Sequence, residues 1–230
     1  MFRLMVFDFD GTLVDSNGIK ERCLEETVAD LPEGPAALAQ ARRAGGNRYQ
    51  IFSEVARRLN QGGDAGAVAR RGHQLAMDYG RRCARGIAAA PERRGSRAAL
   101  AALKRRGLRL YVNSSTPQRD LRGLLRSRGL LSYFNGVAGS PRAKTDNLRK
   151  ILAMERVSPR ETVVVGDGAD DLSAARSLGT WFVAVNVEGR IREAVPYSVK
   201  DMRLLCPLLD RLAPRPMYPD GHRSTAVKSP

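Results

Sequence analysis

Helix-like segments alternate with short apolar, β-branched runs over most of this chain, and this alternation constrains the fold more than any other feature. Short apolar runs of this kind are typical of strands that are buried on both faces, and here they alternate with helices. The pattern therefore predicts an α/β fold. Its core would be a doubly wound parallel sheet with helices on both sides. The expected strands are residues 4–7, 108–112, a weaker run around Val137, 162–166 and 181–185.

One long stretch departs from this alternation. Residues 36–86 read as helices interrupted by the glycine-rich turns "AGGN" and "NQGGDAG", and a further helix to about Ala29 could be capped by Asp15 or Ser16. We therefore expect residues 16–95 to form a separate helical unit, and residues 1–15 and 96–213 to form the sheet domain. The tail 214–230, rich in proline and polar residues, is expected to be loosely ordered.

Composition fits a globular protein of one or two domains. The chain has 230 residues, of which 43% are hydrophobic and 27% charged. It contains neither an apolar stretch of about 20 residues nor a signal-peptide pattern, so we expect a cytoplasmic protein without a membrane partner. Cys23, Cys83 and Cys206 show no paired spacing, which argues against disulfides and a zinc site.

The formal net charge of +15 raises the question of an anionic partner. Arginine pairs are spread along the chain, aromatic residues make up only 6%, and no nucleic-acid-reading motif is present. The sequence therefore favours an anionic substrate over nucleic-acid binding. No pattern in it indicates the oligomeric state.

The first strand ends in "DFDGT", which carries a chemical signal. Residues i and i+2 of a strand point to the same face, so Asp8 and Asp10 project together. Two close carboxylates repel each other unless a cation lies between them, and a hard divalent metal suits oxygen ligands. Gly11 permits a tight turn, and Thr12 adds a hydroxyl and an amide that suit an anion.

Further polar residues follow the other expected strands. Ligands of such sheets bind outside the carboxyl ends of the strands, so these residues should meet Asp8 and Asp10. Together they would supply a carboxylate nucleophile, a metal site and fixed donors for phosphoryl transfer through a covalent aspartate. The residues are Ser114, Ser115 and Thr116 past the second strand, Lys144 after the third, and Asp167, Asp170 and Asp171 after the fourth.

In this order, "DFDGTLVDS", "VNSST", Lys144 and "GDGADD" resemble the four motifs of the haloacid dehalogenase superfamily. The resemblance covers roughly residues 2–187. It implies a Rossmann-like core with a small all-helical cap of the first class (C1 type), similar to phosphoglycolate phosphatase and β-phosphoglucomutase-like members. The expected activity is that of a phosphatase for a small phosphorylated metabolite.

The resemblance also implies roles for individual residues. Asp8 would attack phosphorus and become an aspartyl phosphate, Asp10 would act as general acid and base, and Ser114 and Lys144 would contact the phosphoryl group. Gly11, Thr12, Ser115 and Thr116 are further candidate substrate-binding residues. Magnesium would be bound by Asp8, the backbone carbonyl of Asp10 and Asp167, and supported by Asp170 or Asp171, of which we favour Asp171.

A cap loop in relatives often carries glycine followed by arginine, and "AGGNR" resembles it. Caps of this kind close over the site and select the substrate. Arg48 is therefore the expected substrate contact from the cap, with Asn47 and Arg43 as weaker candidates.

The same resemblance separates several activities. Asp10 disfavours dehalogenation, because hydrolytic dehalogenases lack that aspartate. Lys20, the one lysine between Ser16 and Gly95, begins a linker helix instead of lying on the cap loop, which disfavours a phosphonatase. Thr145 follows Lys144 where relatives often have proline, which suggests an outlying subgroup. A sugar-phosphate mutase remains the alternative, and an inactive basic binding module is a more remote one.

Overall fold

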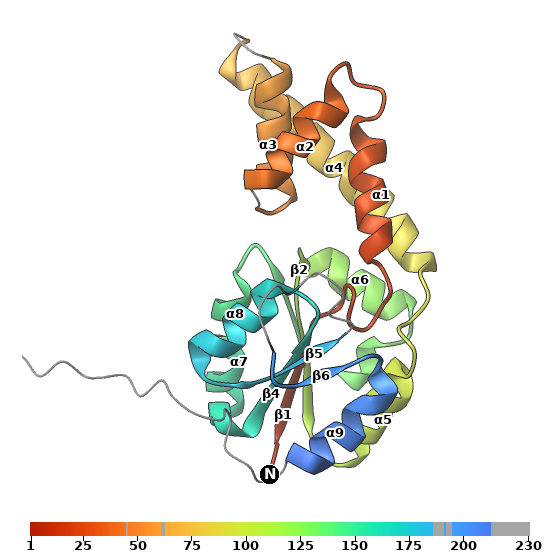
Figure 1. Cartoon of the computed structure of the whole chain (residues 1–230), viewed down its shortest axis with the longest axis vertical. Helices are drawn as coiled ribbons and strands as arrows, with labels where there is room; N and C mark the ends of the chain where they lie inside the picture. Colours follow the sequence, from red (N-terminus) through yellow and green to blue (C-terminus); the bar gives the residue numbers. More distant parts are fainter. Residues whose placement is uncertain (45, 61–62, 186–190, 192–194, 213–230) are drawn as a thin grey trace, which may run out of the picture.

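The computed structural model describes residues 1–44, 46–60, 63–185, 191 and 195–212, and within them the chain forms a parallel six-stranded sheet flanked by helices (Figure 1). The strand order is β3-β2-β1-β4-β5-β6, and every neighbouring pair is parallel. This confirms the predicted doubly wound sheet. The strands are β1 (Leu4–Phe7), β2 (Arg109–Pro117), β3 (Gly136–Ser140), β4 (Thr162–Gly166), β5 (Trp181–Val185) and β6 (Ser198–Val199).

Each face of the sheet packs against its own set of helices. α5 (Ser96–Arg105), α6 (Gln118–Ser127) and α9 (Leu205–Leu212) cover one face, and α7 (Lys144–Glu155) and α8 (Ala169–Leu178) cover the other. Short 3-10 turns precede β3, β4 and α9 at η1 (Leu131–Tyr133), η2 (Pro159–Glu161) and η3 (Met202–Leu204). β6 and α9 were not predicted.

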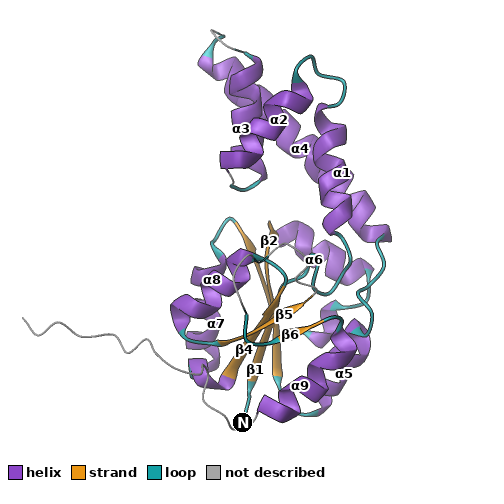
Figure 2. Ribbon diagram, viewed as in Figure 1, coloured by secondary structure: helices purple, strands orange, loops and turns teal. Residues whose placement is uncertain are grey.

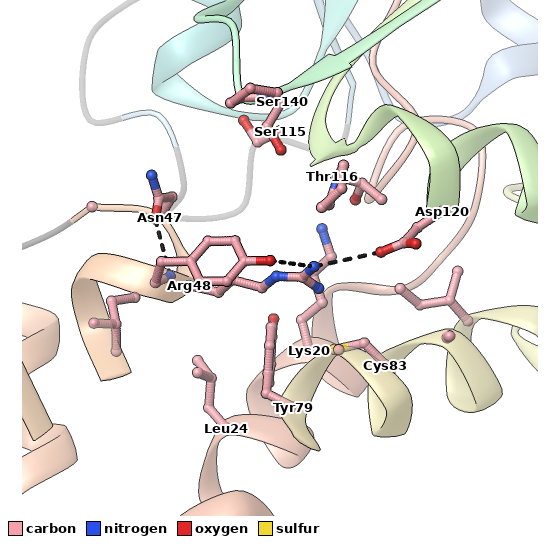
Figure 3. A pocket seen from close by; sticks show the side chains of 18 of the residues that line it. Lys20, Leu24, Asn47, Arg48, Tyr79, Cys83, Ser115, Thr116, Asp120 and Ser140 are labelled. Atoms are coloured by element: carbon pink, nitrogen blue, oxygen red, sulfur yellow. Dashed lines mark hydrogen bonds and ion pairs between the residues drawn. The ribbon is translucent and has the colours of Figure 1, made fainter. Parts of the chain in front are cut away.

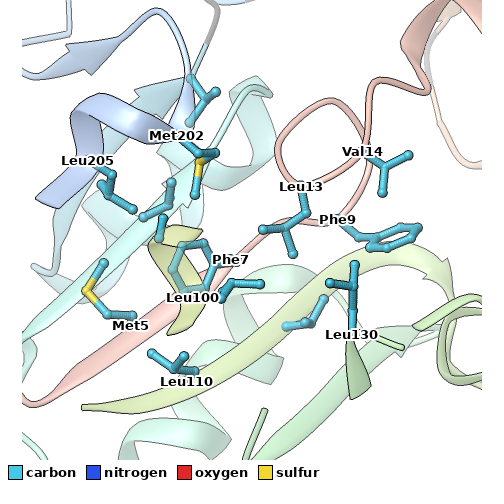
Figure 4. Close-up of a cluster of buried hydrophobic side chains, with 14 of the residues drawn as sticks. Met5, Phe7, Phe9, Leu13, Val14, Leu100, Leu110, Leu130, Met202 and Leu205 are labelled. Atoms are coloured by element: carbon cyan, nitrogen blue, oxygen red, sulfur yellow. The ribbon is translucent and has the colours of Figure 1, made fainter. Parts of the chain in front are cut away.

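Strand β1 shows why the sheet is buried on both sides. Its side chains alternate, so Met5 and Phe7 join the cluster under α5 and α6, while Leu4 and Val6 join the cluster under α7 and α8. Figure 4 shows Phe7 packed beside Leu100 of α5. A strand that is apolar on both faces can lie only in the middle of such a sandwich, and β1 pairs with β2 on one side and β4 on the other.

The residues between β1 and α5 form a group of helices at one end of the sheet (Figure 2). These are α1 (Asn17–Val28), α2 (Gly34–Ala44), α3 (Arg48–Leu59) and α4 (Ala65–Ala89), which we call the helical insert. The insert has a hydrophobic cluster of its own, in which Phe52 is fully buried and contacts Tyr79 with ring centroids 5.5 Å apart. Its helices therefore pack on one another as well as on the sheet domain.

One local expectation was wrong, and another holds only in part. β2 continues to Pro117, so Ser114, Ser115 and Thr116 lie within the end of the strand and not past it. Neither candidate caps α1 with its side chain: Ser16 occupies the cap position but makes no side-chain capping hydrogen bond, because its hydroxyl is donated to Asp10. The tail 214–230 lies outside the described residues. No helix in the described part of the chain is long and apolar enough to cross a bilayer.

Phe52→Ala should destabilise the helical insert while sparing the sheet. Removing a fully buried phenylalanine costs about 3–5 kcal/mol, since it removes apolar burial and leaves a cavity. We expect hydrogen exchange to show a large loss of amide protection in α2, α3 and α4 and a small one in β1 and β4.

The matched change in the sheet domain is Leu100→Ala, at a fully buried position of α5, for which we expect about 2–5 kcal/mol and the reverse pattern of protection. An equal loss of protection throughout the chain in both variants would show that the insert and the sheet domain unfold as one unit.

Candidate active site

The predicted site residues meet at the carboxyl ends of neighbouring strands. β1 lies between β2 and β4, and the chain proceeds to one side after β1 and to the other after β3, so the strand order reverses there. Crevices at such reversal points are where ligands of doubly wound sheets bind. The structure brings together Asp8, Asp10, Ser114, Ser115, Lys144, Asp167 and Asp170 around one cavity, which Asn17 and Lys20 also line.

Asp8 is buried directly after β1. Its backbone N–H donates to Val165 O, 2.8 Å away, which extends the pairing of β1 with β4. One carboxylate oxygen accepts from the N–H of Phe9 at 2.7 Å, and the other lies 3.1 Å from the ammonium group of Lys144. Burial raises the pKa of Asp8 to about 6: Lys144 opposes this rise, and nearby Asp167 adds to it.

Three buried carboxylates form a cluster of candidate metal ligands. Oxygen atoms of Asp8, Asp167 and Asp171 all lie within 4.8 Å of one another. Asp170 is placed differently: its side chain is 52% exposed, lies 3.1 Å from Lys144 and accepts a hydrogen bond from the Ser115 hydroxyl. Between the two acids that sequence reasoning left open, the geometry therefore groups Asp171 with the other candidate ligands.

Lys144 is the buried cation of this cluster, and its side chain is only 6% exposed. It begins α7, and its ammonium group lies 2.9 Å from Asp171 and 3.1 Å from both Asp8 and Asp170. Burial lowers the pKa of Lys144, but the three carboxylates outweigh it and hold that pKa well above its ordinary value. Lys144 is thus a fixed positive charge next to Asp8.

Asp167 is oriented by the segment that follows β1. Thr12 donates its hydroxyl to one carboxylate oxygen at 3.0 Å, and Asn17 donates its amide to the other at 2.7 Å. Gly11 makes this close approach possible, because its φ is 79° and a Cβ atom there would lie 2.2 Å from both the Asn17 amide and the Asp167 carboxylate. Sequence reasoning placed Gly11 and Thr12 in the site but missed Asn17.

The second aspartate of the pair has different neighbours. Asp10 accepts hydrogen bonds from Ser16 and Thr116, both at 2.8 Å, and the ammonium group of Lys20 lies 2.6 Å from one of its oxygens. Burial raises the pKa of Asp10, but Lys20 and the hydroxyl donors outweigh it, so that pKa lies below its ordinary value. Asp8 and Asp10 therefore differ in basicity because their neighbours differ.

Lys20 was not predicted as a site residue. The sequence places Lys20 at the start of a helix and away from the cap loop, which is confirmed. It does not show that this helix, α1, begins beside Asp10. One signal was available: Ser16 and Lys20 are four residues apart, so they lie on the same side of a helix. Once Ser16 faces Asp10, Lys20 faces it as well.

The hydroxyl groups at the end of β2 point to different partners. The Ser114 side chain is buried, and its oxygen accepts from the N–H of Thr116 at 3.2 Å. The Ser115 hydroxyl donates to Asp170 at 3.0 Å, and that of Thr116 donates to Asp10. Ser114 and Ser115 also line the cavity around the acids.

A second pocket, of about 270 Å³, adjoins this cavity between the helical insert and the sheet domain. Lys20 and Ser115 line both spaces. Figure 3 shows Arg48 reaching from α3 toward Asp120 of α6, and the two side chains lie 3.5 Å apart. Asn47 also lines the pocket and caps α3, whereas Arg43, at the exposed end of α2, is not among its lining residues in the described part of the chain.

The cluster of acids fits a divalent cation on its chemistry. Asp8, Asp167 and Asp171 are all nearly inaccessible to solvent, and carboxylate oxygens are the donors that Mg²⁺ prefers. The single ammonium group of Lys144 neutralises only part of this charge, because it is shared with Asp170. Burial also raises the pKa of both Asp8 and Asp171, which a bound cation would reverse.

Comparison with known proteins identifies the family to which the chain belongs. Residues 2–179 match the family model of haloacid dehalogenase-like hydrolases. Phosphoglycolate phosphatase from Pseudomonas putida is 29% identical over 89% of this chain and 79% of its own, and tyrosine-protein kinase PtkA from Mycobacterium tuberculosis is 32% identical over 80% of this chain and 62% of its own.

Among solved structures, that of a predicted phosphoglycolate phosphatase from Haemophilus somnus superposes with a TM-score of 0.72. Its identity is 18%, and the match covers 90% of this chain and 98% of the other, so it bears on the fold alone. The family model covers most of the chain and includes every predicted site residue. The chain belongs to the haloacid dehalogenase-like hydrolase family.

Proposed function

We propose that this chain is a magnesium-dependent phosphatase that hydrolyses a small phosphomonoester through an aspartyl-phosphate intermediate. The observation that carries the proposal is the position of Asp8. It lies 3.1 Å from the ammonium group of Lys144 and within 4.8 Å of the ligand atoms of Asp167 and Asp171. A carboxylate in these surroundings can approach a phosphoryl group, because the repulsion between the two anions is offset by neighbouring cations.

In the first step, an Asp8 carboxylate oxygen forms a bond to phosphorus while the bond from phosphorus to the alcohol oxygen breaks. Lys144 and the N–H of Phe9 hold the two oxygens of Asp8 and so orient the nucleophile. Ser114 and Ser115 face the transferring group from the end of β2. Asp10 enters this step protonated and gives its proton to the leaving alcohol, and Lys20 with the hydroxyls of Ser16 and Thr116 stabilises the carboxylate that the transfer leaves.

In the second step, Asp10 accepts a proton from a water molecule, which attacks phosphorus, releases inorganic phosphate and restores Asp8. Mg²⁺, held by Asp8, the backbone carbonyl of Asp10 and Asp167 and supported by Asp171, would supply the positive charge that stabilises the phosphoryl oxygens. Thr12 and Asn17 keep Asp167 in place for this purpose.

The helical insert is proposed to act as the cap that selects the substrate. With the insert as residues 16–95 and the core as 1–15 and 96–213, the adjoining pocket lies between the two units and takes Arg48 and Asn47 from the cap. A pocket of about 270 Å³ suits a small leaving group. The name of the Pseudomonas putida relative makes phosphoglycolate one candidate substrate.

Hydrolysis is favoured over the sugar-phosphate mutase alternative. Several curated relatives are named phosphoglycolate phosphatases. Asp8, Asp10, Ser114 and Lys144 all line one cavity, and this complete set of residues argues against an inactive binding module. The three cysteines are free thiols, which supports the proposed cytoplasmic location.

Asp8→Asn should abolish turnover while leaving the fold intact. The change removes the nucleophile at nearly constant shape, so we expect phosphate release to fall by several orders of magnitude. The assay measures phosphate released from a panel that includes phosphoglycolate, a sugar phosphate and p-nitrophenyl phosphate, with Mg²⁺ and with chelator. Circular dichroism checks the fold.

Release by the wild type that persists with chelator, or that Asp8→Asn retains, would contradict the proposed mechanism. Conversion of a sugar phosphate into its isomer without phosphate release would favour the mutase.

Asp171→Asn and Asp170→Asn should separate the two acids of "GDGADD". Because Asp171 belongs to the buried cluster and Asp170 does not, Asp171→Asn should weaken Mg²⁺ binding by about 10- to 100-fold. Asp170→Asn should change it much less. Calorimetric titration of the protein with Mg²⁺ measures this directly, and Mn²⁺ and Ca²⁺ test which cation the site prefers. A larger loss in Asp170→Asn would reverse the assignment.

A further inference from the structure

Lys20 lies where the two spaces of the site meet. It comes from the first turns of α1 and lines both the cavity around the acids and the pocket under the helical insert. In the described part of the chain, Ser115 is the one other residue that lines both. Under the proposed function, the phosphoryl group occupies the cavity and the leaving group occupies the pocket. The bond that breaks would therefore lie next to Lys20.

At this junction Lys20 forms an ion pair with Asp10. Within the described part of the chain, this is its one ion pair with a carboxylate. The distance from its ammonium group to the carboxylate oxygen is 2.6 Å, and the exposed fractions of the two side chains are 28% and 5%. Because little water reaches Asp10, the attraction between the two charges is screened less than in an exposed surface pair. Lys20 is thus a fixed neighbour of Asp10.

The contacts of Asp10 come from two parts of the molecule. Thr116, at the end of β2, donates to the same oxygen that faces Lys20, while Ser16 donates to the other oxygen. Both oxygens are therefore held, and the plane of the carboxylate is fixed. Two of the three donors, Ser16 and Lys20, belong to the start of the insert, so the orientation of Asp10 depends on where α1 lies.

We propose that Lys20 is a positioning residue that holds the Asp10 carboxylate toward the leaving-group oxygen. The inference rests on the proposed function, because it assumes that Asp10 gives a proton to the leaving alcohol. It adds a residue from the helical insert to the proton-transfer machinery of the sheet domain. Proton delivery then requires α1 to lie against the site, as it does in this structure.

The consequence can be measured with esters that differ in their need for a proton. An alkyl alcohol leaves poorly without protonation, whereas p-nitrophenolate leaves readily as an anion. Since kcat/KM reports the steps up to release of the alcohol, it isolates this first proton transfer from the later attack of water. Lys20→Met keeps most of the length of the side chain and removes the charge.

Lys20→Met should lower kcat/KM for an alkyl phosphate such as phosphoglycolate by about 10- to 100-fold, because Asp10 is no longer held toward the leaving oxygen and the carboxylate left after proton transfer loses its neighbouring cation. This loss is smaller than the 10²- to 10⁴-fold typical of general acid catalysis because Asp10 itself is retained, and kcat/KM for p-nitrophenyl phosphate should change only about twofold. Lys20→Arg keeps the positive charge, so it should retain most of the wild-type kcat/KM for the alkyl ester. Lys150→Met, at an exposed lysine of α7 away from the site, is the matched control and should change neither value. The retained aryl activity shows that the variant folds.

A double-mutant comparison tests the link to Asp10. In an Asp10→Asn background, Lys20→Met should have no further effect on kcat/KM for the alkyl ester. A further loss there, or an equal loss for both esters, would overturn the inference and make Lys20 a substrate contact. If Asp10→Asn itself leaves kcat/KM for the alkyl ester unchanged, the proposed role of Asp10 fails, independently of Lys20.

Discussion

The ion pairs of one buried ammonium group hold the candidate site together. Lys144 lies within 3.1 Å of Asp8, Asp170 and Asp171, which arrive from β1 and from α8. A group of buried carboxylates without such a partner would be protonated or would spread apart. Because one lysine offsets only part of the charge, the site keeps a net negative charge. This charge suits the site to a metal cation, and a bound cation would in turn suit it to a phosphate.

The two aspartates of the first motif differ because of what surrounds them. Asp8 is surrounded by other acids and Lys144, whereas Asp10 is surrounded by two hydroxyl donors and Lys20. They follow β1 only two residues apart, so their place in the sequence does not by itself distinguish them. The distinction comes from Thr116 at the end of β2 and from Ser16 and Lys20 at the start of α1, which supply hydrogen bonds and a positive charge to Asp10.

Local patterns predicted the strands well where they are buried on both faces. The apolar runs at β1, β4 and β5 matched the strands residue by residue, because such runs can be satisfied only in the middle of a covered sheet. β6 has only two residues, too few for an alternation of apolar and polar side chains to be recognised, so it was not predicted. The end of β2 was misplaced because Ser114 and Ser115 have no apolar signal. They lie in an irregular stretch between Asn113 and Pro117, and the pairing of Pro117 with β3 shows that the strand continues past them.

The sequence by itself determined the chemistry of the site: which acids follow β1 and β4, which hydroxyls end β2 and which lysine begins α7. Strand order in a parallel sheet then leads those segments to one edge. Only the tertiary structure decided the partners of each acid. Asn17 reaches Asp167 across 150 residues, and Thr116 reaches Asp10 across 106. Hydrogen bonds extend over about 3 Å, so such pairs depend on packing between elements, which no local pattern encodes.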